Sequence, residues 1–208
     1  IPNASWVSVI QQVHLAGGTP LIVPTDPKDA YLLTPKVFRE ALSSLPAGQK
    51  VGVYICSPNN PTGGIISPQL SKEIAAVAKQ SGREVIFMVD QLYHAFGNAK
   101  ETGLNLGLGS SLGIHSPAHD LDPQQTVVVD GLAKTAGMTG SRVATLYSKN
   151  PEIIGLLTAF HSHNATVTTP IQWGFVAETK RLIKDPSVIR SITLDYAERR
   201  GKVRDMLN

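Results

Sequence analysis

The chain has 208 residues, of which 42% are hydrophobic and 17% charged, so it can bury one sizeable core and form one or two domains. Its 19 basic and 16 acidic residues give a net charge of +3, and no Lys/Arg run marks a nucleic-acid-binding surface. No apolar run is long enough to span a bilayer, and no signal-peptide pattern is visible. We therefore expect neither a nucleic acid nor a membrane as a partner.

The single cysteine, Cys56, excludes an internal disulfide and is typical of a reducing compartment. It ends an apolar run, which favours a small buried side chain over a nucleophile. We accordingly expect a cytoplasmic protein.

Apolar runs alternate with segments of helical periodicity along most of the chain. The runs predict strands near residues 20–23, 51–56, 85–89, 126–129 and 143–147. Helical spacing and start signals predict helices near residues 5–16, 34–45, 67–80, 151–161, 171–183 and 187–208. This alternation indicates the α/β class, as a three-layer αβα sandwich around a mostly parallel sheet. The connection 137–142 is too short for a parallel crossover, so the last strand should be antiparallel.

One long segment, residues 97–125, is rich in Gly, Ser, Pro and His and has no clear period. A segment of this kind is uncommon inside a domain, and it is typical of functional or irregular surface structure.

Three polar motifs directly follow predicted strands. The first is the sequence CSPNNPTGG at 56–64, the second is VDQLY at 89–93, and the third is GLAKTAGMTGSR at 131–142. Because the carboxyl ends of parallel strands meet at one edge of a sheet, these motifs can converge although they lie far apart in sequence.

In order and spacing, the motifs resemble those of the class I/II aminotransferases, the fold type I family of pyridoxal-phosphate-dependent enzymes. The resemblance implies that Lys134 forms the Schiff base with pyridoxal 5'-phosphate and that Arg142 binds its phosphate. A guanidinium suits this role because it makes two charge-assisted hydrogen bonds. The chain departs from the family at Gly131, where a phosphate-binding serine or threonine is usual, and at Ala144, where a glycine is frequent.

The resemblance also assigns roles to residues of the other motifs. Asp90 would pair with the ring nitrogen and keep it protonated, while Tyr93 and Asn60 would bond to the phenolic oxygen. Trp6 would stack on the ring. Lys134, Asp90 and Tyr93 would thus be the catalytic residues.

Each of these residues also has an ordinary structural interpretation. Asp90 suits a helix cap, Tyr93 packing against the next helix, and Asn60 a tight turn. Trp6 suits a core position, and Lys134 a surface turn.

His161 and His163 would suit zinc, but no cysteine or acidic residue lies at ligand spacing, so no metal site is expected. In the family, the segment that corresponds to residues 162–172 lies near a dimer interface. The resemblance therefore implies a homodimer, in which Thr168, Thr169 and Gln172 reach the partner's site.

The resemblance covers nearly the whole chain. It implies a cofactor-binding large domain at 1–186, incomplete at its N-terminus, and an interdomain helix at 187–208. The family's glycine-rich phosphate loop would precede Ile1. A small domain with the arginine for the substrate carboxylate would follow Asn208. We therefore expect a fragment of a longer enzyme.

The expected function is amino transfer between an L-amino acid and a 2-oxo acid. Two alternatives stay open: a carbon–sulfur lyase or cyclopropane-forming synthase of the same fold, and an aminotransferase-like sensor domain of a transcription regulator. A substrate screen would separate the two enzyme classes, and a winged-helix segment upstream would indicate the regulator.

Overall fold

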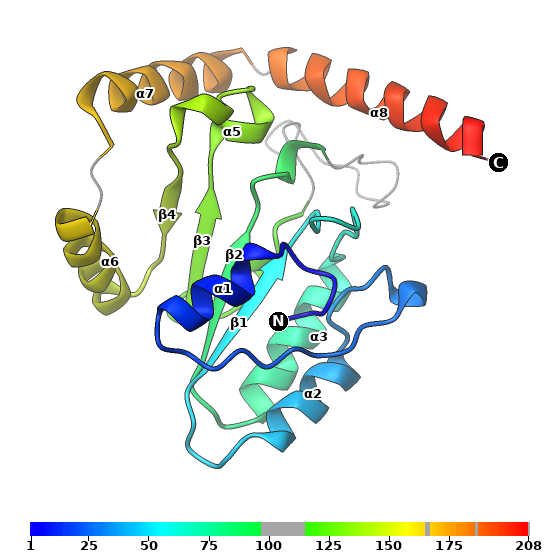
Figure 1. The fold of residues 1–208 in the computed structure, drawn as a ribbon, viewed down its shortest axis with the longest axis vertical. Helices are drawn as coiled ribbons and strands as arrows, with labels where there is room; N and C mark the ends of the chain where they lie inside the picture. Colours follow the sequence, from blue (N-terminus) through cyan, green and yellow to red (C-terminus); the bar gives the residue numbers. More distant parts are fainter. Residues whose placement is uncertain (97–114, 165–166, 186, 208) are drawn as a thin grey trace. The chain divides into compact units, whose positions relative to one another are not determined.

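The computed structural model describes residues 1–96, 115–164, 167–185 and 187–207 (Figure 1). The strands are β1 (Val51–Cys56), β2 (Val85–Asp90), β3 (Thr126–Asp130) and β4 (Thr145–Tyr147). The α-helices are α1 (Ser8–Leu15), α2 (Pro35–Ser44), α3 (Pro68–Gln80), α5 (Leu132–Thr135), α6 (Pro151–Asn164), α7 (Thr169–Lys184) and α8 (Ser187–Leu207). Short 3-10 helices are η1 (Pro27–Asp29), η2 (His94–Phe96), η4 (Pro117–His119) and η5 (Thr139–Ser141).

The four strands form one mixed sheet in the order β1-β2-β3-β4, with helices flanking it. β1 pairs with β2 and β2 with β3 in parallel, so the one antiparallel pair is β3–β4. The predicted α/β class and the antiparallel last strand are confirmed.

The predicted strand at 20–23 is wrong, because only Val23 makes an isolated parallel bridge, with Pro2. Pro20 begins this run and Pro24 follows it, and proline has no N–H to donate to a ladder. The last strand also begins later than predicted, at Thr145, since the backbone at Arg142 turns into the left-handed region with φ 54°.

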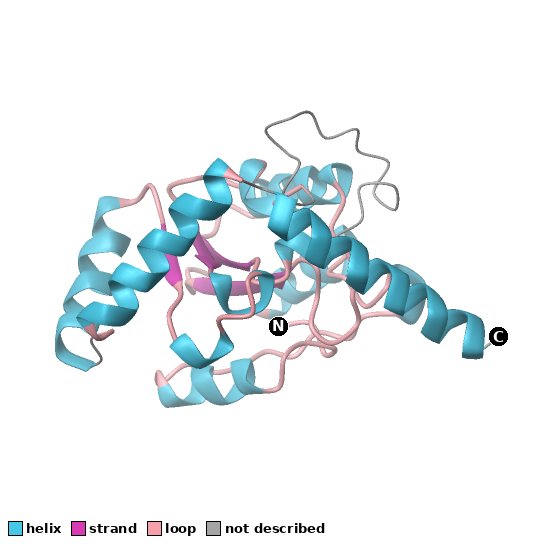
Figure 2. Cartoon of the chain, turned by 90° about the horizontal axis from the view of Figure 1, so that it is seen from above, coloured by secondary structure: helices cyan, strands magenta, loops and turns pink. Residues whose placement is uncertain are grey.

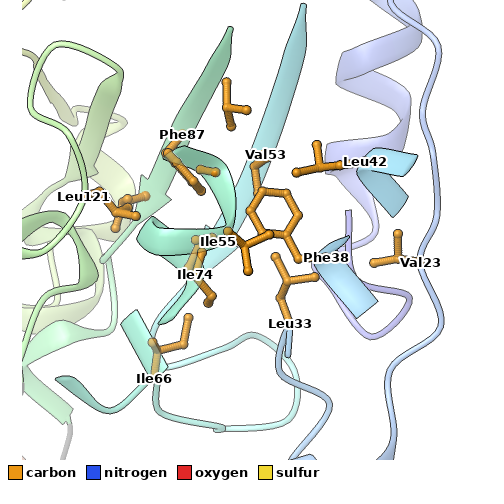
Figure 3. Close-up of a cluster of buried hydrophobic side chains, with 14 residues drawn as sticks. Val23, Leu33, Phe38, Leu42, Val53, Ile55, Ile66, Ile74, Phe87 and Leu121 are labelled. Atoms are coloured by element: carbon orange, nitrogen blue, oxygen red, sulfur yellow. The ribbon is translucent and has the colours of Figure 1, made fainter. Parts of the chain in front are cut away.

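The main core lies on the face of the sheet that α2 and α3 cover (Figure 3). Alternate residues of β1 and β2 supply it, among them Ile55 and Phe87, and the Phe38 ring of α2 meets Phe87 edge-on at 6.2 Å. Thr34 and Ser67 cap the two helices by accepting hydrogen bonds from backbone N–H groups. These caps fix where the two helices begin.

Part of the segment 97–125 belongs to this core rather than to the surface. Leu121 is 3% exposed, and the Ser71 hydroxyl donates to the carbonyl of buried Pro117 at 3.1 Å. The prediction for residues 97–114 lies outside the described residues.

By its internal contacts the chain forms two compact units. Unit 1 comprises residues 1–91, 116–129 and 146–154, and unit 2 comprises the described parts of 92–115, 130–145 and 155–208. Unit 2 is largely helical, with helices in cyan in Figure 2, and has a small core around Ala95, Leu182 and Ile189. Its η2 and α8 are joined by the Thr193 hydroxyl, which donates to the Ala95 carbonyl at 2.7 Å. The expected domain boundary at 186, a residue outside the described part, stays a prediction.

Among the described residues, no helix combines the length and apolar character that crossing a membrane requires.

Candidate functional site

Asp90 ends β2 in unit 1 and is buried, with 8% of its surface exposed. Strand pairing sets Cys56, the last residue of β1, beside it and places Val129 of β3 opposite it on the other side. The Tyr54 hydroxyl donates to Asp90 Oδ2 at 2.8 Å. A buried carboxylate is costly without such donors, so this hydrogen bond helps to hold Asp90 in place.

Sequence reasoning missed Tyr54. The residue lies in the middle of β1, 6% exposed, where a tyrosine suggests ordinary packing. The alternation of side chains along a strand could have identified Tyr54 from the sequence. Tyr54 lies two residues before Cys56, so the two side chains face the same side of the sheet. Burial, together with the charges of Cys56 and Asp90, raises the pKa of Tyr54 far above its ordinary value, so the phenol stays a donor.

Cys56 is a free, buried thiol, 5% exposed, as the sequence predicts. It donates to the Pro58 carbonyl at 3.2 Å. Burial first, and then the charge of Asp90, raises the pKa of the Cys56 thiol from 9.0 to about 11. The thiol therefore stays protonated near neutral pH and is a poor nucleophile.

The loop that carries Asn60 is built by its neighbour Asn59. The Asn59 N–H donates to the Gly64 carbonyl at 2.8 Å, and its carbonyl accepts from Gly63 N–H at 2.8 Å, which closes a tight turn. Its buried side-chain amide donates to the Ala4 carbonyl at 2.8 Å. Asn60, half-buried, is the next residue in this turn. Asn59 is thus a structural residue that sequence reasoning did not single out.

Two further contacts fix the ends of this loop. Ser57 N–H donates to the carbonyl of Asp90 at 3.1 Å, which ties the loop's start to the end of β2. At its far end Gly64 has no room for a side chain, since a Cβ would lie 2.7 Å from the Ala30 carbonyl oxygen.

Trp6 precedes α1 in unit 1 and is 40% exposed, so it is not a core residue. The Asn59–Ala4 hydrogen bond ties its segment to the loop that carries Asn60.

Lys134 lies in unit 2 on the short helix α5 and is exposed. Its Nζ lies 5.9 Å from the centroid of the half-buried Tyr93 ring. The structure thus brings together the lysine and tyrosine of two different motifs. An ammonium at this distance is attracted by the ring's electron-rich face.

Arg142 is exposed, and its φ of 54° is rare for a residue with a side chain. Gly131 has extended backbone, but a Cβ there would lie 3.3 Å from both Ala144 Cα and the Val143 carbonyl oxygen. Unit 2 therefore packs closely around the position where the family usually has a hydroxyl.

The six predicted site residues divide between the units. Unit 1 holds Trp6, Asn60 and Asp90, and unit 2 holds Tyr93, Lys134 and Arg142. Their convergence on one pocket stays a prediction.

The two histidines lie in the last turn of α6, both exposed, and His163 Nδ1 is 2.7 Å from the Ala159 carbonyl. In the part of the chain that the structure describes, no three His, Cys, Asp or Glu residues gather as metal ligands.

Comparison with known proteins gives a consistent result. Residues 1–207 match the family described as aminotransferase class I and II. The chain is 31% identical to an aspartate aminotransferase of Geobacillus stearothermophilus over 82% of its length and 39% of that protein. It is 28% identical to an aromatic-amino-acid aminotransferase of Thermococcus litoralis over all of this chain and 49% of that protein.

Among solved structures, an aromatic aminotransferase of Pyrococcus horikoshii superposes with a TM-score of 0.77 at 25% identity, over 100% of this chain and 51% of that one. The chain thus spans about half the length or less of these proteins. With a family match along almost its whole length, the chain belongs to the class I and II aminotransferases.

Proposed function

We propose that this chain is the cofactor-binding part of an aminotransferase that moves an amino group between an L-amino acid and a 2-oxo acid. Class I and II aminotransferases depend on pyridoxal phosphate. The strand register carries the proposal: Cys56 pairs with Asp90, and Asp90 pairs with Val129. Cys56, Asp90 and Val129 thus lie side by side at the sheet edge where α/β folds bind ligands, and each of the three motifs begins at or next to one of these strand ends.

Asp90 fits the role of partner to the ring nitrogen. It is a buried carboxylate at a strand end, held by the Tyr54 hydroxyl at 2.8 Å. Such a group favours a cationic N–H opposite it. When bound, pyridoxal phosphate would supply an electron sink for the charge that leaves the α-carbon of the amino acid.

The other residues would hold the rest of the cofactor. Asn60 and Tyr93 would donate hydrogen bonds to the phenolic oxygen, and Trp6 would cover the ring with its indole face. Arg142 would bind the phosphate through its planar guanidinium. Its left-handed backbone, with φ 54°, supports a functional role because such strain collects at binding sites.

Lys134 would hold the cofactor covalently through its amine. Once the substrate's amino group has displaced it, the same amine would carry a proton to and from the substrate α-carbon. Its position 5.9 Å from the Tyr93 ring supports a common site for the two side chains.

Gly131 offers no hydroxyl to the phosphate, and the closeness of Ala144 and Val143 leaves little room for one. Arg142 would then contribute a larger share of the phosphate-binding energy than it does in relatives with a serine at the position of Gly131.

We also propose a cytoplasmic homodimer. Large apolar side chains of α6 and α7 in unit 2 are exposed, among them Phe160 and Trp173 at 68% each. Burial of these side chains against a second copy of the chain would remove their apolar surface from water. The free, buried Cys56 is compatible with a reducing compartment. Sedimentation should show a dimer that Trp173→Asp weakens, and a wild-type monomer would contradict the proposal.

The activity is tested on the holoenzyme that carries this chain. Borohydride reduction should fix the cofactor on the peptide that contains Lys134, as read by mass spectrometry. The relatives are named as aspartate and aromatic aminotransferases, so L-aspartate and L-phenylalanine with 2-oxoglutarate are the first pairs to assay. Attachment to a different lysine would refute the assignment. Attachment to Lys134 with elimination products instead of amino transfer would favour a lyase.

A further inference from the structure

A buried polar cluster lies on one face of the sheet at the ends of β1 and β2. Tyr54, Cys56 and Asp90 are 6%, 5% and 8% exposed. Cys56 and Asp90 are register partners, and Tyr54 lies two residues before Cys56, so the three side chains share a face. The neighbouring residues Ile55 and Val89 point the opposite way, into the main core.

The cluster fixes both the backbone and the side chain of Asp90. The Asp90 carbonyl accepts from Ser57 N–H at 3.1 Å, and the next N–H, of Gln91, donates to the Val129 carbonyl at 3.0 Å. The Tyr54 hydroxyl binds Oδ2 at 2.8 Å. A hydroxyl that binds a charged carboxylate makes a stronger hydrogen bond than one between neutral groups.

We propose that Tyr54 is a positioning residue, which holds the Asp90 carboxylate in the orientation that receives the ring nitrogen of the cofactor. This inference rests on the proposed function and adds to it a residue that does not itself touch the cofactor. A carboxylate at a strand end can rotate about two side-chain bonds, and a bond to one of its oxygens restricts both rotations. Because its raised pKa keeps the Tyr54 phenol protonated, this restraint persists across the pH range in which the enzyme would work.

The inference predicts a selective effect of Tyr54→Phe, which removes the hydroxyl and keeps the ring. The loss should appear only when the ligand has a ring nitrogen for Asp90 to meet. Loss of a hydrogen bond to a charged group corresponds to roughly a 10- to 100-fold loss of affinity.

The test titrates the apoprotein with pyridoxal phosphate and with its carbocyclic analogue, in which carbon replaces the ring nitrogen. Affinity is read from absorbance and fluorescence, without any turnover. Tyr54→Phe should weaken binding of pyridoxal phosphate by about 10-fold or more and change binding of the analogue by less than about 2-fold. Tyr147→Phe is the matched control, because Tyr147 is 57% exposed on β4, and it should change neither affinity.

An equal loss of affinity for both ligands would overturn the inference, because it would indicate general damage to the fold. Unchanged affinity for both ligands would also overturn it. If Tyr54→Phe does not fold, the Asp90→Ala variant is compared with the Asp90→Ala, Tyr54→Phe double variant. In this background no buried carboxylate is left without a partner. There the inference predicts no further loss of pyridoxal phosphate affinity from Tyr54→Phe, and a further 10-fold loss would overturn it.

The titration separates this inference from the proposed function. A wild-type protein that fails to bind pyridoxal phosphate would refute the proposed function. A wild-type protein that binds it at Lys134, with Tyr54→Phe unchanged for both ligands, would refute only the role of Tyr54.

Discussion

The strand end that carries Asp90 and the segment that carries Lys134 are held by different kinds of structure. Asp90 closes a six-residue strand, is 8% exposed, and has its carboxylate bound by Tyr54. Lys134 is exposed on a four-residue helix that ends a few residues before the left-handed turn at Arg142. A group that only has to hold one charge in one place benefits from the rigid sheet. The role proposed for Lys134, which is to bind the cofactor, release it and carry a proton, requires a side chain that can move.

The largest effect should come from a change at Lys134. Lys134→Ala should lower amino transfer by about 10²- to 10⁴-fold, because in the proposed function one amine both holds the cofactor and carries the proton. Steady-state assays and the loss of the absorbance of lysine-bound cofactor would check this. Lys149→Ala, an exposed lysine just after β4, is the control and should leave the rate unchanged. Near-normal turnover of Lys134→Ala would remove Lys134 from the chemistry.

Asp90→Ala should be the second-largest change. The cofactor should remain attached to Lys134, while turnover falls by about 10- to 100-fold because the ring nitrogen loses its charged partner. The measurement pairs the absorbance spectrum with kcat. If the attached cofactor is lost together with the rate, Asp90 would have a mainly structural role, and the contrast between the two regions would fail.

A third substitution probes packing beside Lys134. Gly131→Ser should lower the free energy of unfolding by about 1–3 kcal/mol, because its Cβ would lie 3.3 Å from Ala144 Cα and the Val143 carbonyl. Urea unfolding would measure the change. At Gly140 nothing lies within 4 Å of a Cβ, so Gly140→Ser is the matched control and should cost much less. If both variants lost the same unfolding free energy, the space around Gly131 would not restrict a side chain.

The smallest effect concerns Cys56. Its pKa is raised to about 11, so at pH 8 only about one thiol in a thousand is ionised, and burial slows reagents further. Alkylation by iodoacetamide should therefore be slow and should keep accelerating above pH 9. Asp90→Ala should speed it, because the Asp90 charge contributes to the raised pKa. A rate that levels off near pH 9 in the folded protein would contradict the burial of this thiol.

Much of the fold followed from local patterns. The apolar runs at β1, β2 and β3 are long enough to predict buried strands. Asp90 ends β2, and Asn60 and Lys134 lie four residues after the ends of β1 and β3. The prediction of a strand at 20–23 was wrong because an apolar run alone does not show whether a neighbouring strand exists to pair with it, and Pro20 has no N–H to donate.

Tyr54 and Asn59 were not predicted from the sequence for the same reason. Tyr54 reaches Asp90 and Asn59 reaches Ala4, in each case across a long stretch of sequence. Both contacts depend on tertiary structure, and neither tyrosine in a strand nor asparagine in a turn is unusual by itself. The roles of Lys134 and Arg142 came from the family resemblance, because a lysine or an arginine near a turn has no local signature of function.

The close approach of Gly64 to Ala30 has a consequence for protein engineering. Thr62 Oγ1 also donates to the Ala30 carbonyl, at 3.2 Å, so two residues of the Asn60 loop rest on one peptide group. A chimera that imports this loop from a relative without the segment around Ala30 would place the loop against a host segment whose surface is not complementary to it. The loop and residues 30–32 form one transplantable module, and recombination boundaries should keep them together.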